Sequence, residues 1–340
     1  MKIAIVGVTG VVGETILRVL DERRVAVEEL GAFASRDRRE PLIWQGRVWP
    51  IFAATPEALR NGGFDVVFFA SSDDASAELA EHALASGAVV IDNSATFRMK
   101  TGVPLIIPEV NPDAVSKEHR IFPVANCTAI VLCMALAPVA RAFGLRSVRV
   151  ATYQAVSGAG RAGLDALERE EKAAYDLEPN LEASPFVRQI FHNVIPQVGS
   201  IDEFGDSGEE KKIAAEIRKM LGLPNLHVAA TAVRVPVRYA HSVAAFIETE
   251  RGTDVVALGD ALGLSPGVVF FPDGSVTPRD VEGQDRVFVS RLRAEEGRSR
   301  RHFQLWVVGD QIRKGAATNA VQILELLVER GLVGKSKQRV

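Results

Sequence analysis

The sequence has 340 residues, 47% of them hydrophobic and 24% charged, with a formal net charge of −3. This composition is ordinary for a globular protein of about two domains, and the small net charge argues against a nucleic-acid binder. No apolar run approaches the ~20 residues of a membrane helix, and MKIAIVGVTG does not resemble a signal peptide, so we expect no membrane partner.

In the first third of the chain, short β-rich runs alternate with segments of helical periodicity. Strands are predicted over residues 2–6, 30–35, 65–70 and 88–94, and helices over 14–23 and 77–87. Gly87 is expected to close the second of these helices. The alternation predicts a parallel sheet with helices on both faces, and such sheets bind ligands beyond the carboxyl ends of their strands.

From about residue 145, apolar and polar residues alternate more clearly. Strands are predicted over residues 148–156, 228–237, 241–250 and 285–293, and helices over 163–177, 208–221 and 316–331. This pattern predicts an α+β arrangement around a mostly antiparallel sheet with one covered face.

A glycine-rich turn, GVTGVVG, follows the first predicted strand and contains Gly7, Gly10 and Gly13. Glycines allow the backbone to approach a pyrophosphate, and the start of the next helix offers N–H donors. The GxxGxxG spacing departs from the commoner GxGxxG, and a tight turn without a ligand is the alternative. The strand–turn–helix context favours a dinucleotide-binding site.

Residues 35–39, SRDRR, follow the second predicted strand. Arginines at this position suit the 2′-phosphate of NADP(H). Asp37 argues the other way because it would repel that phosphate, so NAD(H) stays open as the cofactor. For Arg38 and Arg39, a solvated charged loop is the alternative.

Asn126 predicts the N-cap of an apolar helix that begins beside Cys127. A thiol in the first turn of a helix becomes a nucleophile, because the helix dipole favours thiolate. A buried structural cysteine is the alternative, and we favour it for Cys133. Pro138 should kink or end this helix. The 2 cysteines predict neither a disulfide framework nor a metal site, which suits a reduced, cytoplasmic chain.

A nucleophile needs a base, and His241 is the best placed of the 6 histidines because it begins a predicted strand. Arg234 lies seven residues earlier in an otherwise apolar strand, where its planar fork suits a carboxylate. An internal salt bridge is the alternative for Arg234. Arg98, after a predicted strand, has the same two interpretations.

These features together resemble the aspartate-semialdehyde dehydrogenases along nearly the whole chain. The stretches that carry the resemblance are GVTGVVG, VVIDNSATFRM, IPEVNP, NCTAI, TYQAVSGAG, NVIPQ, EEKK, VRVPVRYAHS, TPRDVEGQDRVFVSRLR and RKGAATNAVQI. The resemblance implies a Rossmann-like dinucleotide-binding domain over 1–126 and about 315–340. It also implies a substrate and dimerisation domain over 127–314.

The family's catalytic roles would fall on three residues. Cys127 corresponds to the nucleophile, and Gln154 corresponds to the glutamine that orients the substrate and thioacyl group. His241 corresponds to the acid/base, which donates a proton in its imidazolium form. These roles imply acyl-phosphate chemistry through a covalent thioester.

Five further positions match the family's substrate-binding residues. Arg234 would grip the α-carboxylate, and Glu209 would lie near the amino group. Arg98 and Lys212 would bind the phosphate, and Asn126 would line the oxyanion or phosphate pocket.

The cofactor-binding positions implied by the resemblance are Gly7, Thr9, Gly10, Val11, Val12, Gly13, Ser35, Arg36, Ser71, Ser157, Gly158 and Gln311. Three departures from the family pattern lie among the cofactor contacts. Residues 71–74 read SSDD instead of an Ala-Gly-Gly-like loop, Asp37 replaces a serine, and Gln311 replaces an asparagine.

The implied reaction is the NADPH-dependent reduction of aspartyl phosphate to aspartate semialdehyde and phosphate by a cytoplasmic homodimer. The family's product leads to lysine (through diaminopimelate), threonine, methionine and isoleucine. An N-acetylglutamyl-phosphate reductase is the nearest alternative, and a catalytically silent paralogue is another. A phosphate-binding NTPase is disfavoured because no GxxxxGK[ST] sequence occurs.

Overall fold

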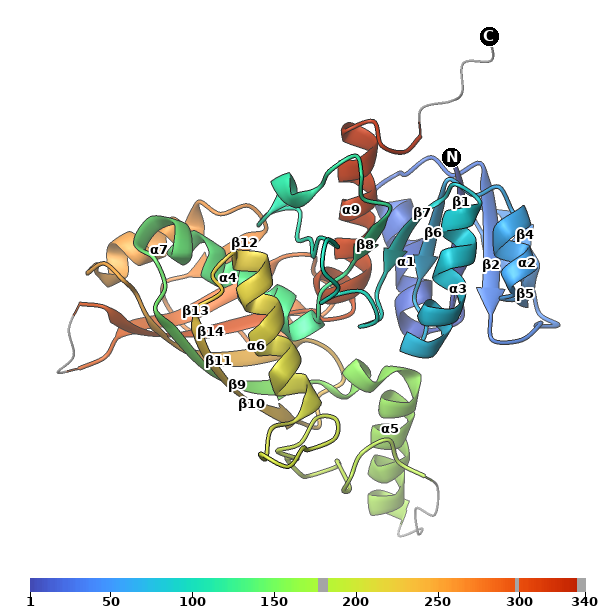
Figure 1. Ribbon diagram of the computed structural model, residues 1–340. Coiled ribbons are helices and arrows are strands. Elements are labelled where there is room, and N and C mark those ends of the chain that lie inside the picture. The colour runs from blue at the N-terminus through green and yellow to red at the C-terminus, as the bar shows by residue number, and fades with distance from the viewer. Residues whose placement is uncertain (177–182, 297–299, 335–340) are drawn as a thin grey trace. The chain divides into compact units, whose positions relative to one another are not determined.

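The computed structural model describes residues 1–176, 183–296 and 300–334, and the chain divides into two compact units (Figure 1). The first unit contains Met1–Ala125 and Ala316–Val340, and the second contains Asn126–Gly315. Residue 177, the end of one predicted helix, and residues 335–340 lie outside the described residues. In the described ranges, no helix is long and apolar enough to cross a membrane.

The first unit is built on a parallel six-stranded sheet in the order β5-β2-β1-β6-β7-β8. Its strands are β1 (Lys2–Val6), β2 (Glu29–Ala34), β5 (Ile51–Ala53), β6 (Val66–Phe69), β7 (Val89–Asp92) and β8 (Ile121–Pro123). All five pairings are parallel, which confirms the predicted sheet. A small antiparallel hairpin of β3 (Leu42–Trp44) and β4 (Arg47–Trp49) is separate from it.

Helices cover both faces of this sheet because its strands are apolar on both sides. The helices are α1 (Val11–Glu22), α2 (Pro56–Asn61), α3 (Asp73–Ala85) and α9 (Thr318–Glu329). Val6 and Phe69 pack in one cluster with α2 and α3. Successive strand residues point to opposite faces, so the buried Ile5 and Phe68 face α1 and α9, which contact each other.

The second unit contains a six-stranded sheet in the order β10-β9-β11-β14-β13-β12. Its strands are β9 (Ser147–Gln154), β10 (His227–Arg234), β11 (His241–Glu248), β12 (Val268–Phe271), β13 (Val287–Ala294) and β14 (His302–Gly309). The three central pairings are antiparallel, as predicted, and the two edge pairings are parallel. The parallel edges arise because β9 reaches β10, and β12 reaches β13, through helical crossovers.

Three helices, α4 (Cys127–Phe143), α6 (Gly208–Leu221) and α7 (Val255–Gly263), contact the second sheet from the face visible in Figure 1. Two further helices, α5 (Gly160–Asp176) and the short α8 (Pro278–Val281), connect strands. Side chains on the other face remain partly open, with Tyr153 38% and Phe246 40% exposed. One face is therefore covered, as predicted.

Several helix boundaries differ from the predictions, and for two of them the physical reason is clear. The expectation that Pro138 could end its helix is wrong, because α4 continues through it to Phe143. The helix is buried along most of its length, and that burial outweighs the ~3 kcal/mol that an interior proline costs. Helix α3 begins at Asp73, before the predicted start, because the Ser72 hydroxyl accepts a hydrogen bond from the Ala75 N–H at 3.3 Å.

Candidate active site

Cys127 is the first residue of α4, and Asn126 is its N-cap. The Asn126 side chain accepts a hydrogen bond from the Ala129 N–H at 3.1 Å, which confirms the predicted cap. The thiol therefore lies at the positive end of a 17-residue helix, where thiolate is favoured. The other cysteine, Cys133, is fully buried, and burial raises the pKa of its thiol, with the nearby Glu216 charge raising it further.

Helix α6 holds Asn126 with two carboxylates. The backbone N–H of Asn126 donates to Glu216 Oε2 at 2.5 Å, and its Nδ2 donates to Glu209 Oε1 at 2.9 Å. Gln154 Nε2 donates to the same Glu209 oxygen at 3.1 Å and to Thr128 Oγ1 at 2.8 Å. The structure thus brings Asn126, Gln154 and Glu209 together at the start of α4.

His241 begins β11, as predicted, and is fully buried. Its Nδ1 accepts a hydrogen bond from the Ala155 N–H at 3.0 Å, so the neutral ring carries its proton on Nε2. Among the described residues, Nε2 has no hydrogen-bond partner. Burial lowers the pKa of His241 well below its usual value of 6.5, and the charge of Arg234 lowers it further. This favours a neutral imidazole over the expected imidazolium.

Arg234 ends β10 and is 6% exposed. Its Nη1 donates to the Ala155 carbonyl at 2.7 Å, and its guanidinium carbon lies 5.7 Å from the centre of the Phe186 ring. Burial lowers the pKa of Arg234, and the charges of Cys127 and Glu209 oppose that shift. Within the described part of the chain, Arg234 makes no ion pair, which disfavours the internal salt bridge as its purpose.

Two glycines let these side chains approach one another. A Cβ added to Gly158 would lie 2.7 Å from Arg234 Nη1 and 3.3 Å from His241 Nε2. A Cβ added to Gly315 would lie 3.0 Å from the Cβ of Cys127. Gly158 was expected near the site, whereas Gly315 and Glu216 were not singled out as site residues. The sequence signal for Gly315 was its place within RKGAATNAVQI, one of the stretches that carry the family resemblance.

Gln311 and Ser157 form a buried polar pair in the second unit. Gln311 Nε2 donates to the Ser157 hydroxyl, which in turn donates to the Arg238 carbonyl. Gln311 Oε1 is buried and has no partner among the described residues. A hydrogen-bond donor on a ligand would satisfy it, as the carboxamide of a nicotinamide can.

The backbone of the glycine-rich turn in the first unit is packed too closely to leave room for side chains at Gly7 and Gly13. Gly7 has a φ of +91°, and a Cβ there would lie 2.3 Å from the Ala70 carbonyl oxygen. A Cβ on Gly13 would lie 2.2 Å from the Gly7 carbonyl oxygen. The Ser71 hydroxyl is buried, with no partner in the described ranges. The remaining residues expected at this turn lie at or beside the start of α1: Thr9, Gly10, Val11 and Val12.

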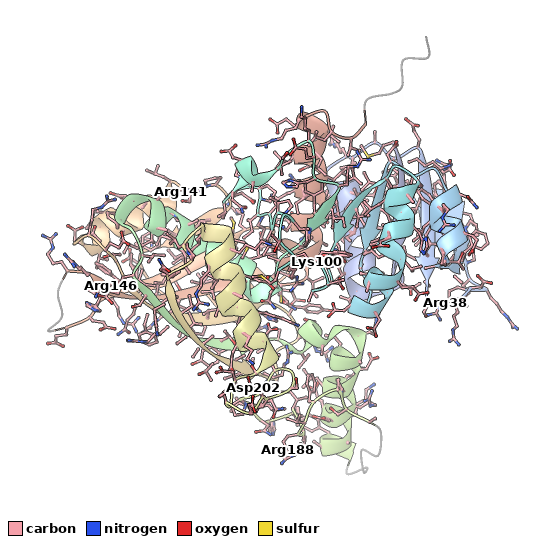
Figure 2. The ribbon with its side chains drawn as sticks, in the orientation of Figure 1. Arg38, Lys100, Arg141, Arg146, Arg188 and Asp202 are labelled. Carbon is pink, nitrogen blue, oxygen red and sulfur yellow. The ribbon has the colours of Figure 1, made fainter. Side chains whose placement is uncertain are left out.

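The loop after β2 carries three exposed arginines, of which Arg38 projects outward in Figure 2. Ser35 and Arg36 are exposed in the same loop. Asp37 is engaged locally, because its Oδ1 accepts a hydrogen bond from the Ala53 N–H at 2.7 Å. The Asp37 carboxylate therefore ties the loop to β5, and the arginine side chains remain available to solvent.

The two residues expected to bind phosphate belong to different units. Arg98, in the first unit, is 9% exposed and donates to the Val124 carbonyl at 2.9 Å and the Asn93 carbonyl at 2.8 Å. Lys212, in the second unit, is exposed on α6, three residues after Glu209. Helical spacing places Glu209 and Lys212 on the same side of α6.

Comparisons with known proteins identify the family of this chain. The family model "Semialdehyde dehydrogenase, NAD binding domain" matches residues 2–118, and "Semialdehyde dehydrogenase, dimerisation domain" matches residues 136–314. The chain is 40% identical over 343 residues to the aspartate-semialdehyde dehydrogenase of Aquifex aeolicus (strain VF5), covering 98% of this chain and 99% of the relative. The chain belongs to the aspartate-semialdehyde dehydrogenase family.

Solved structures of this family have the same fold. Aspartate semialdehyde dehydrogenase II of Vibrio cholerae, complexed with ASA, is 36% identical with a TM-score of 0.89, over 96% of this chain and 98% of that one. The Candida albicans aspartate semialdehyde dehydrogenase with NADP is 22% identical with a TM-score of 0.73, over 98% and 99% of the two chains. Membership of the family makes this protein an oxidoreductase of amino-acid biosynthesis.

Proposed function

We propose that this chain catalyses the NADPH-dependent reductive dephosphorylation of L-aspartyl 4-phosphate to L-aspartate 4-semialdehyde, through a thioester on Cys127. The observation that carries the proposal is the convergence of a helix-start thiol, a buried histidine and a buried arginine without an ion pair among the described residues. The binding of ASA by the Vibrio cholerae relative supports the aspartyl substrate.

Substrate binding would use the charges of this site. The Arg234 fork would hold the α-carboxylate through two parallel hydrogen bonds, and Glu209 would bind the α-amino group. Arg98 and Lys212 would neutralise the phosphate. Holding the acyl carbon next to a nucleophile can lower the barrier by about 7 kcal/mol or more in favourable intramolecular cases.

In the acylation step, the Cys127 thiolate would attack the acyl carbon. A carbon–sulfur bond forms, the bond between that carbon and the phosphate oxygen breaks, and phosphate leaves. Gln154 would orient the acyl group. The Asn126 N–H is occupied by Glu216, so the Nε2–H of His241 is our preferred donor to the oxyanion, together with the N–H groups of the first turn of α4.

In the reduction step, Cys127 would be the leaving group. A reduced nicotinamide, when bound, would supply the hydride that converts the thioester to the aldehyde. The Nε2–H of His241 would stabilise the charge that develops on the carbonyl oxygen, and collapse of that oxyanion would return Cys127 to the thiolate form. A neutral His241 suits this role because its one proton points from Nε2.

NADP(H) is the cofactor that we propose over NAD(H). The turn at Gly7 and the start of α1 would hold the pyrophosphate, and the unpartnered oxygens of Ser71 and Gln311 would accept donors from the cofactor. The exposed arginines of the loop after β2 would bind the 2′-phosphate, since the Asp37 carboxylate is tied to Ala53. The thioester chemistry proposed here requires no metal.

We also propose that the enzyme is a cytoplasmic homodimer acting in lysine, diaminopimelate, threonine, methionine and isoleucine biosynthesis. The matching dimerisation-domain model and the partly exposed Tyr153 and Phe246 on the open sheet face support the dimer. An exposed apolar patch of this kind is typical of an interface.

The reverse reaction tests the proposed function. Aspartate semialdehyde, phosphate and NADP+ are mixed with the protein, and absorbance of the reduced nicotinamide is followed, with NAD+ and N-acetylglutamate semialdehyde as comparisons. We expect a phosphate-dependent rise with the aspartyl substrate and a faster rate with NADP+. No rise with either aldehyde would instead support a catalytically silent paralogue, and a rise only with the acetylated aldehyde would support an N-acetylglutamyl-phosphate reductase.

A further inference from the structure

A buried glutamate on α6 contacts the residue that precedes the nucleophile. Glu216 is 1% exposed, and its Oε2 accepts a hydrogen bond from the Asn126 N–H at 2.5 Å. Placing a carboxylate in the interior is costly unless hydrogen bonds and opposite charges compensate it. Lys219, one turn further along α6, is close enough for its charge to interact with Glu216. The buried Glu216 carboxylate therefore restrains the Asn126 backbone to which it is hydrogen-bonded.

The contact lies at the point where β8 and the following residues pass into α4. Asn126 has extended rather than helical backbone angles, with φ −53° and ψ 135°, and Cys127 is the next residue. The backbone N–H of an N-cap residue has no partner inside its own helix. Glu216 supplies that partner from another helix, 90 residues later in the chain.

Glu216 and Glu209 act on Asn126 from the same face of α6. They are seven residues apart, which is two helical turns, so both side chains point toward the start of α4. Glu209 takes the side-chain amide and Glu216 takes the backbone N–H. A hydrogen bond to the backbone restrains the path of the chain, whereas a bond to a side chain leaves the backbone free to shift.

We propose that Glu216 is a positioning residue, which fixes the backbone at the Asn126–Cys127 junction and so sets where the thiol lies and how readily it attacks. The proposal rests on the function proposed above only for the identity of the substrate. Misplacement of a reacting group by about 1 Å can lower a rate about 100-fold, so the loss of this anchor should act on turnover more than on substrate affinity.

Three substitutions distinguish the effect of the hydrogen bond between Glu216 and Asn126 from the effect of the negative charge of Glu216. Glu216→Asp keeps the charge but shortens the side chain by one methylene, Glu216→Ala removes the acceptor, and Glu216→Gln keeps an acceptor oxygen of the same reach. We expect Asp and Ala to lower kcat between about 10- and 100-fold with KM for aspartate semialdehyde within about threefold. We expect Gln to restore kcat to within about fivefold of the original enzyme.

Glu170→Asp is the matched control. Glu170 is also buried, at 5% exposure, and accepts backbone N–H bonds from Ile190 and Phe191 at 2.7 and 2.8 Å. Its substitution tests a loss of stability that does not involve the start of α4. The control variant should unfold more easily while its Cys127 reactivity stays unchanged.

The direct readout is the rate at which iodoacetamide alkylates Cys127, followed by peptide mass spectrometry at fixed pH in the folded enzyme. We expect at least a fivefold change in Glu216→Asp. Unchanged kcat and unchanged alkylation in Glu216→Asp would overturn the proposal, even if Glu216→Ala failed to fold. Alkylation needs no substrate, so it tests Glu216 even if the enzyme proved inactive with aspartate semialdehyde.

Discussion

The backbone N–H of Ala155 decides which nitrogen of His241 carries a proton. A donor facing Nδ1 disfavours both the Nδ1–H tautomer and the imidazolium, because each would place two hydrogens against each other. Burial acts in the same direction. At the scale of the residue, His241 is therefore built to donate one hydrogen bond from Nε2.

The stability of the protein should depend on pH through His241. The pKa of His241 is lowered in the folded state, so below about pH 6.5 the unfolded chain binds a proton that the folded chain does not. The free energy of unfolding therefore decreases as the pH falls, by up to ~1.4 kcal/mol per pH unit. Urea unfolding of the full-length protein at pH 7.5 and 5.5 measures this change in the free energy of unfolding. His241→Gln should lose about 1 kcal/mol less than the original chain between these values. Equal losses in both proteins would show that His241 is not the group responsible.

Replacing the proposed nucleophile should separate chemistry from binding. Cys127→Ser is expected to abolish turnover, because a serine hydroxyl in the same place lacks thiolate nucleophilicity. Cofactor affinity, measured by fluorescence titration of NADPH, should stay near normal. Turnover above a few per cent of the original would remove Cys127 from the nucleophile role. Cys133→Ser serves as the control, since that side chain is buried within α4.

The role proposed for Arg234 in binding the substrate carboxylate predicts a change in affinity. Arg234→Lys should mainly raise the KM for the aspartyl substrate, about tenfold or more, because a two-pronged fork becomes a point charge. Steady-state kinetics with aspartate semialdehyde measure this. An unchanged KM would assign Arg234 a structural role through its bond to the Ala155 carbonyl.

At the scale of the element, the site depends on how closely backbone segments approach. Gly315 lies in a π-helical turn, Arg313–Ala317, and Asp310 fixes the start of that turn by accepting N–H bonds from Ile312 and Arg313 at 2.9 and 3.1 Å. The turn leaves no room for a side chain beside Cys127. π-Helical turns are often found at functional sites.

Adding one methyl group at this turn should disturb the thiol. In Gly315→Ala the new Cβ would lie 3.0 Å from the Cβ of Cys127, so one of the two must move. We expect kcat to fall at least about tenfold, with the melting temperature lowered by only a few degrees. In the control Gly263→Ala the new Cβ has nothing within 4 Å and kcat should stay unchanged. Equal activity in the two variants would contradict the close approach.

Local patterns predicted much of this site and missed what arises between distant elements. The Asn126 cap, Cys127 at the start of its helix and His241 at the start of its strand each follow from a few neighbouring residues. Glu216 was missed because, in a charged amphipathic helix, a glutamate is normally expected to face solvent, and only the packing of α6 against α4 buries it. The parallel edges of the second sheet were missed because strand patterns do not identify pairing partners.

At the scale of the whole molecule, the second sheet presents a face that α4, α6 and α7 do not cover and that α8 covers only in part, around Phe288 and Val308. Tyr153 of β9 and Trp306 of β14 contact each other on that face, with ring centres 5.4 Å apart, and Phe246 lies on β11, the strand between these two. Aromatic side chains on an uncovered sheet are costly to leave in water. A second copy of the chain is the occupant that the proposed homodimer supplies.

A charge placed on this face should separate the dimer. Phe246→Asp is expected to convert the protein to a monomer, because the carboxylate would have to be buried at the interface. Light scattering after size-exclusion chromatography gives the mass directly. The control Val256→Asp changes a 73% exposed residue of α7 and should leave the mass unchanged. A dimeric Phe246→Asp protein would place the interface elsewhere.

The first unit is assembled from both ends of the chain. Asn319 in α9 donates to the Ile106 carbonyl at 2.9 Å, and Arg23 in α1 pairs with Glu325 in α9. A ribosome that has finished residue 125 must still add about 200 residues before α9 exists, on the order of 10 to 40 s at typical speeds of synthesis. During that interval the apolar sheet face that α9 covers in the folded protein stays exposed. The nascent chain therefore needs protection from aggregation until synthesis is nearly complete.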